Sequence, residues 1–102
     1  MPLTVALQSG TGEVLDRILD PEAALSRLLP TEGSSAYSFL SSIDRYGDTI
    51  FNRVQAPRFL KEWEDVQAKT ESAYERELCL SIRNLFQEMQ AGVHLYVRFI
   101  GD

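Results

Sequence analysis

Alternating apolar and polar side chains predict strands near both ends of the chain. Residues 93–100 alternate an apolar row with a polar row, and the polar row holds His94, Tyr96 and Arg98. A period of two is typical of a half-buried strand. Residues 3–8 alternate in the same way, and residues 13–19 are predicted as a second strand after a glycine-containing turn, so the two segments predict a β-hairpin.

Three other segments have the apolar spacing of amphipathic helices. Asp20 followed by Pro21 is typical of a helix start, with the aspartate as N-cap and the proline at the first helical position. A second helix is expected to begin near Pro57. A third is expected to follow Ser72, whose spacing from Glu75 is that of a capping box.

Residues 36–55 carry mixed signals. Tyr37 and Phe39 alternate with polar neighbours, so we predict a short strand near residues 37–40. After it, residues 44–53 are rich in polar and aromatic side chains and contain Gly47, which predicts an irregular connector. We use "connector" for residues 44–53 throughout.

The order of these elements predicts one α+β domain over residues 1–102. We expect a small, mainly antiparallel sheet of three or four strands, with three helices packed against it and the last strand beside the first. The apolar stripes of the second and third helices should meet in the core. The residues expected there are Phe59, Leu60, Trp63, Leu78, Ile82 and Phe86.

The acidic composition narrows the classes of partner. The formal net charge is −5 and the pI is about 4.8, which disfavours non-specific binding to nucleic acids or to anionic membranes. A basic partner protein fits this charge better. Neither a signal peptide nor a membrane-spanning apolar stretch is visible, so the sequence predicts a soluble, cytoplasmic protein.

The inventory of reactive side chains is small. A single histidine and a single cysteine, Cys79, cannot form a zinc site or an internal disulfide. No phosphate-binding loop or nucleophile motif is present, so we predict no metal, no cofactor and no independent catalysis. Cys79 lies beside apolar residues of the third helix and is expected in the core.

The polar row of the last strand is one candidate site. In one interpretation, His94, Tyr96 and Arg98 line a small-ligand or enzyme site, with Asp48 as a second titrating group. In the other, they form a partly exposed row that is hydrogen-bonded to the connector.

The connector is the other candidate site, and here also two interpretations stay open. Its polar side chains can brace the loop internally, or they can form a partner-binding surface, because Tyr and Arg are favoured at interface centres. The candidate partner-binding residues are Asp44, Arg45, Tyr46, Asp48, Asn52 and Arg53.

Two blocks of the sequence resemble a group of small bacterial proteins of about this length. They are Tyr-Gly-Asp-Thr-Ile-Phe-Asn-Arg at residues 46–53 and His-Leu-Tyr-Val-Arg-Phe-Ile-Gly-Asp at residues 94–102. This resemblance carries over no catalytic or binding residue. In size, acidity and predicted layout the chain also resembles immunity proteins, which block a toxin by surface contact. That resemblance implies a bacterial cytoplasmic protein whose partner is a basic toxin or enzyme.

Overall fold

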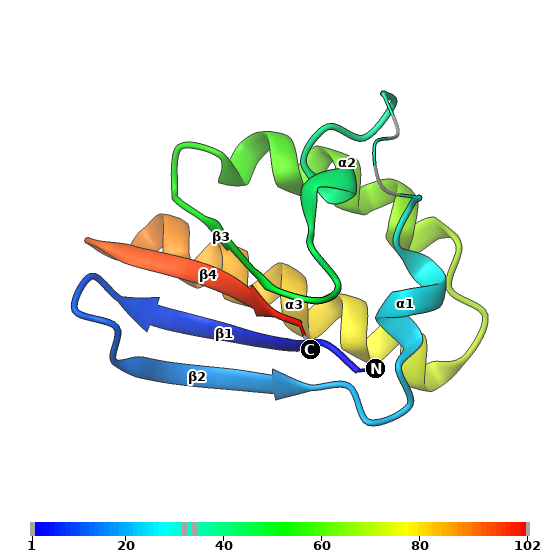
Figure 1. The fold of residues 1–102 in the computed structure, drawn as a ribbon, viewed down its shortest axis with the longest axis horizontal. Helices are drawn as coiled ribbons and strands as arrows, with labels where there is room; N and C mark the ends of the chain where they lie inside the picture. The colour runs from blue at the N-terminus through cyan, green and yellow to red at the C-terminus, as the bar shows by residue number, and fades with distance from the viewer. Residues whose placement is uncertain (1, 32, 34, 102) are drawn as a thin grey trace.

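The computed structural model describes residues 2–31, 33 and 35–101, and in them shows a four-stranded antiparallel sheet with three α-helices and one short 3-10 helix (Figure 1). This confirms the predicted α+β fold. The strands lie in the order β2-β1-β4-β3, so the last strand pairs with the first, as expected. The strands are β1 (Thr4–Ser9), β2 (Val14–Leu19), β3 (Asp48–Phe51) and β4 (Leu95–Ile100). The helices are α1 (Ala24–Leu28), η1 (Leu40–Ser42, a 3-10 helix), α2 (Ala56–Ala68) and α3 (Ala73–Ala91).

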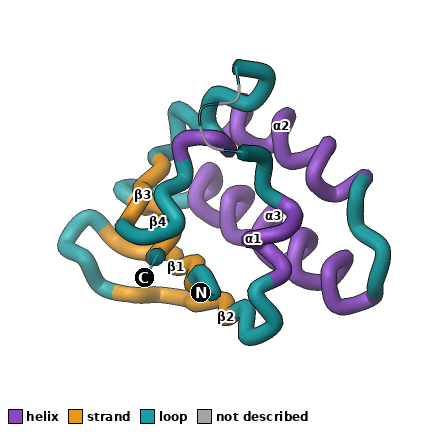
Figure 2. Tube along the Cα trace, turned by 45° about the vertical axis from the view of Figure 1, so that its right-hand side comes forward, coloured by secondary structure: helices purple, strands orange, loops and turns teal. Residues whose placement is uncertain are grey.

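The helices cover one face of the sheet and leave the other face open (Figure 2). The alternation of side chains in β4 explains this arrangement, because Val97 and Phe99 are fully buried while Tyr96 and Arg98 are only half-buried. The open face continues into β3, where Ile50 pairs with Arg98 and is 56% exposed. Both polar positions of β4 therefore lie on the face that the helices do not cover.

The core is aromatic where α2 and α3 meet the sheet. The rings of Phe59 and Phe86 stack with centroids 3.8 Å apart, and Trp63 stacks on Phe59. Trp63 is fully buried and its Nε1 donates a hydrogen bond to the carbonyl of Cys79 at 3.0 Å. The expected core residues are buried except Leu60, which is half-buried.

The predicted strand at residues 37–40 is wrong. The chain there leads into η1. The strand that completes the sheet is β3, which lies inside the segment predicted as an irregular connector. The backbone amides of Phe39 and Leu40 donate to the carboxylate of Glu62 on α2 rather than to a neighbouring strand. A distant side chain satisfies these amides, and no local pattern reveals it.

The last strand begins two residues later than predicted. His94 has a φ of 55°, in the left-handed region, so it ends the turn after α3 and does not belong to the strand. Val93 is 71% exposed and does not join the buried apolar row. The alternation of the sequence runs through this turn, but the paired strand does not.

Helix starts agree with the sequence in part. Glu75 donates its backbone N–H to Ser72 Oγ at 3.1 Å, which confirms the cap of α3. Asp20 does not cap a helix that begins at Pro21, because α1 begins at Ala24. Its buried carboxylate accepts hydrogen bonds from the first two backbone amides of α1, at 3.0 and 2.8 Å. It also accepts a hydrogen bond from the hydroxyl of Tyr74 at 2.7 Å.

Candidate functional site

The connector begins with a turn that its own side chains close. Asp44 Oδ1 accepts a hydrogen bond from the backbone N–H of Tyr46 at 2.9 Å, and the N–H of Asp44 donates to Thr49 Oγ1 at 2.9 Å. A short polar side chain that bonds the backbone two residues on is typical of Asx turns. Asp44 therefore shapes the turn that leads into β3 and leaves Tyr46 on its outer side, 76% exposed.

Arg45 ties this turn to the end of α1. Its guanidinium donates to the carbonyls of Ser26, Leu29 and Pro30 at 2.7, 3.3 and 3.2 Å. The last carbonyls of a helix lack partners within the helix, and a cation there is favourable. The structure thus gives this candidate binding residue an internal role.

Two glycines let β4 end against the connector. The N–H of Gly101 donates to the carbonyl of Gly47 at 2.7 Å, next to the carbonyl of Arg45. A Cβ atom at Gly101 would lie 2.5 Å from the Arg45 oxygen, closer than any ordinary contact. The two blocks that carry the resemblance to small bacterial proteins are therefore in contact here and are paired along β3 and β4.

Asp48 and Arg98 form an ion pair across these two strands. In the register, Asp48 is opposite Ile100 and Arg98 is opposite Ile50, so the pair is diagonal on the open face. Both side chains are about one-third exposed. The charges of these two candidates largely compensate each other.

Asn52 organises the start of α2. Its Oδ1 accepts from the backbone N–H groups of Val54 and Gln55 at 3.0 and 3.1 Å, and Gln55 Oε1 accepts from the N–H of Asn52 at 2.9 Å. These bonds fix the turn that carries Arg53. Arg53 is exposed and makes no hydrogen bond or ion pair with the residues that the structure describes.

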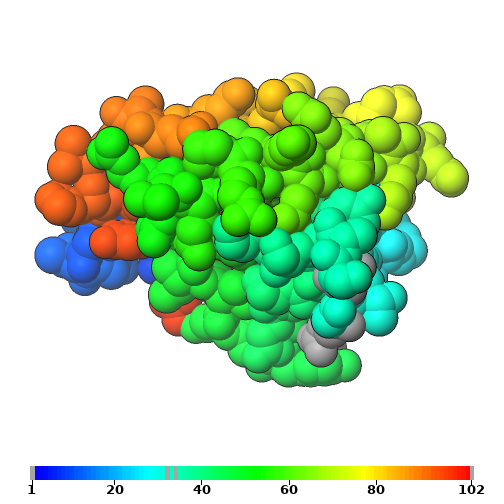
Figure 3. Space-filling view, turned by 90° about the horizontal axis from the view of Figure 1, so that it is seen from above, coloured from blue at the N-terminus to red at the C-terminus, as the bar shows by residue number. Residues whose placement is uncertain are grey.

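The braced connector thus holds a few large side chains at the surface, where they are exposed to solvent. In Figure 3, atoms coloured green, which belong to the connector and to α2, form much of the visible face. The exposed large apolar and aromatic side chains in and beside β3 are Tyr46 at 76%, Ile50 at 56% and Val54 at 82%. Asp44, Arg45 and Asn52 brace the backbone, while Tyr46, Ile50 and Val54 are exposed to solvent.

A hollow of about 270 Å³ lies where the turn after α3 meets the turn before α2. We call it the His94 hollow. Its lining residues are Asn52, Arg53, Val54, Val93, His94, Leu95 and Tyr96. It joins residues from both candidate sites, because the step beyond the pair Phe51–Val97 brings Asn52 opposite Tyr96. Asp48 and Arg98 lie further along the strands and do not line it.

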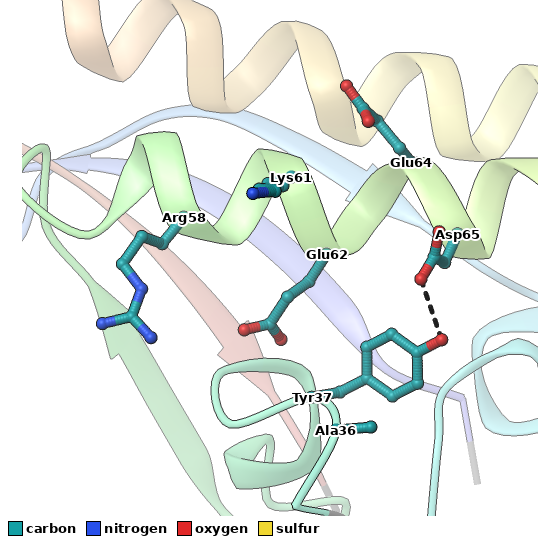
Figure 4. Close-up of a pocket in the computed structure, with 7 residues that line it drawn as sticks. All are labelled: Ala36, Tyr37, Arg58, Lys61, Glu62, Glu64 and Asp65. Atoms are coloured by element: carbon teal, nitrogen blue, oxygen red, sulfur yellow. Dashed lines mark hydrogen bonds between the residues drawn. The ribbon is translucent and has the colours of Figure 1, made fainter.

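A second hollow, of about 380 Å³, lies between α2 and the segment before η1 (Figure 4). Tyr37 donates to Asp65 Oδ2 at 2.9 Å, and this hydrogen bond together with desolvation raises the pKa of the tyrosine above its ordinary value. Arg58 and Lys61 face the same space as Glu62. No pattern in the sequence indicates this hollow, and the strand predicted near residues 37–40 places Tyr37 in a different setting.

Reactive chemistry is sparse in the part of the chain that the structure describes. Burial raises the pKa of the Cys79 thiol to about 11, and Glu75 and Asp20 add to this effect. Its thiolate is therefore scarce at neutral pH. Within the same described residues, no cluster of His, Cys, Asp or Glu could hold a metal ion. None of the described helices has the length and apolar character needed to cross a membrane.

Comparisons with protein-family models, curated proteins and solved structures found no match for this chain. The function is therefore argued from the geometry of the connector and of the His94 hollow.

Proposed function

We propose that this protein is a non-catalytic protein-interaction domain of the immunity type, acting in the bacterial cytoplasm. It binds its partner through the connector and an acidic surface. The observation that supports this most directly is the braced connector, which holds Tyr46 and Ile50 exposed while Asp44 and Arg45 fix the backbone beneath them. A loop that is already ordered loses little conformational freedom on binding, and tyrosine is favoured at energetic centres of interfaces.

The charge of the chain supports a basic partner. Several acidic side chains, among them Glu64, Glu77 and Glu88, are exposed, and the whole chain carries a net charge of −5. Such a field raises the association rate with a cationic protein more than it raises the final affinity. A basic toxin or enzyme fits both the charge and the exposed apolar side chains.

The test compares two matched variants in affinity capture from the native host, followed by titration of the recovered partner. Tyr46→Ala combined with Ile50→Ala should weaken binding at least tenfold while the circular dichroism spectrum stays unchanged. Leu80→Ala removes an equally apolar side chain, 52% exposed, from α3 and should leave binding unchanged. If the double variant binds the same partner with undiminished affinity, the connector is not the interface.

An enzymatic assay then tests the immunity role. The purified protein should inhibit the activity of a captured toxin in proportion to its occupancy, and the double variant should inhibit less. A captured partner whose activity is unaffected by saturating protein would contradict the immunity role while leaving the interaction itself in place.

A further inference from the structure

The His94 hollow differs in charge from the rest of this acidic chain. Neither Asp nor Glu lines it, although the chain has fifteen of them. Arg53 and His94 face it, together with the side chains of Asn52 and Tyr96. A hollow that collects hydrogen-bond donors and excludes carboxylates favours an anionic ligand.

The donors in this hollow are free to bind. Arg53, His94 and Tyr96 make no side-chain hydrogen bond or ion pair with any residue in the described ranges. Asn52 uses its Oδ1 to brace the turn, which leaves its amide N–H₂ group for another acceptor. Internal contacts of the fold therefore leave four side-chain donors unused at one place.

The backbone holds two of these donors in fixed positions. His94 adopts a φ of 55°, which costs a non-glycine residue on the order of 1 kcal/mol and persists only where the surrounding structure enforces it. The turn between β1 and β2 supports this position, since a Cβ atom at Gly10 would lie 3.6 Å from His94 and 3.9 Å from the ring of Tyr96.

The remaining walls are apolar. Leu95 is half-buried, while Val54 and Val93 are 82% and 71% exposed. Valines this exposed gain from being covered by an apolar group. The walls thus favour a ligand whose charged group is attached to an apolar body.

We propose that the His94 hollow binds a carboxylate attached to an apolar body. Arg53 would take the carboxylate in a charge-assisted hydrogen bond, with His94, Tyr96 and Asn52 as further donors, and the valines would cover the apolar body. The source of the carboxylate is either a free small acid or the C-terminus of a peptide. This inference does not depend on the proposed partner binding, because a small molecule tests it.

The experiment is a titration of ¹⁵N-labelled protein followed by amide chemical shifts at constant ionic strength. Phenylacetate is the free-acid probe, and phenylacetamide is its neutral match. N-acetylphenylalanine stands for a peptide C-terminus. We expect saturable shifts confined to the amides of residues 52–54 and 93–96 with both acids, and binding at least tenfold weaker with the amide. The tighter of the two acids then identifies the source, and either order supports the site.

Three variants change these side chains one at a time. Arg53→Gln removes the positive charge and should weaken phenylacetate binding at least tenfold, since the charge-assisted hydrogen bond to the carboxylate is lost. Tyr96→Phe and His94→Asn should weaken it less, and asparagine tolerates the left-handed backbone of position 94. Arg17→Gln removes the same charge from an exposed position of β2 and is the matched control.

Each contrary result overturns the proposal. The absence of saturable shifts with both acids, or equal affinity for acid and amide, would show that the hollow does not select a carboxylate. Equal weakening by Arg53→Gln and Arg17→Gln would assign the effect to overall charge. The amide spectrum of each variant verifies that it is folded, so loss of binding cannot be confused with loss of structure.

Discussion

Replacing Gly101 by alanine should break the contact that joins β4 to the connector. The new Cβ atom would lie 2.5 Å from the carbonyl oxygen of Arg45 and 2.7 Å from that of Gly47. These contacts are about 1 Å shorter than ordinary van der Waals distance, and both neighbours are backbone atoms that cannot rotate away. Either the connector or the end of β4 must move.

The expected cost follows from what that movement removes. Separating the two segments breaks the hydrogen bond from the Gly101 N–H to the Gly47 carbonyl, worth about 1 kcal/mol. Keeping them together instead forces overpacking, which costs about 1–3 kcal/mol. The variant should therefore lose about 1–3 kcal/mol of a total stability of roughly 5–15 kcal/mol.

Urea unfolding measured by circular dichroism gives this difference, and amide hydrogen exchange locates it. The amides of residues 45–48 should exchange faster in the variant, because their turn is released from β4. Gly10→Ala is the matched control, since its Cβ atom would meet no atom closer than 3.6 Å. A Gly101→Ala protein within about 0.3 kcal/mol of this control, with unchanged exchange at residues 45–48, would refute the reasoning.

Three further predictions concern single side chains. Asp20→Ala should lower the free energy of unfolding by about 2–4 kcal/mol in urea titrations, because two amides of α1 and the Tyr74 hydroxyl lose their buried acceptor. The control Asp16→Ala, at an exposed position, should lower it by less than about 0.5 kcal/mol. Ala23 has a φ of 54°, so Ala23→Gly should raise the melting temperature, with a gain of about 0.5–1 kcal/mol. The Cys79 thiol should not react with an aromatic disulfide reagent at pH 8 until the protein unfolds. Burial raises its pKa from an ordinary 9.0 to about 11, so its contribution to stability is present below pH 9 and falls as the pH rises toward 11.

The elements that the sequence predicted best are those set by local periodicity. The stripes of α2 and α3 and the hairpin of β1 and β2 follow from residues close together in the chain. Residues 36–51 could not be predicted in this way. Their backbone depends on Glu62 of α2 and on pairing with β4, two partners that are distant in sequence.

The sequence shows where the polar side chains of the connector lie but not what they do. For Asp44, Arg45 and Asn52 it leaves two interpretations open, bracing the loop or binding a partner, and the structure shows these three side chains bracing it. A carboxylate or a guanidinium has the same sequence signature in both roles. Only the acceptor or donor that it meets in three dimensions distinguishes them.

The His94 hollow joins residues from both candidate sites. Position 94 and position 53 are far apart in the chain, and only the pairing of β3 with β4 brings their turns side by side. The same pairing places Asp48 and Arg98 further along the strands, where their charges compensate each other. Four of the nine candidate residues, Asn52, Arg53, His94 and Tyr96, thus line the same hollow. The last three have no internal hydrogen-bond partner among the described residues, and the carboxylate titration tests each of them by substitution.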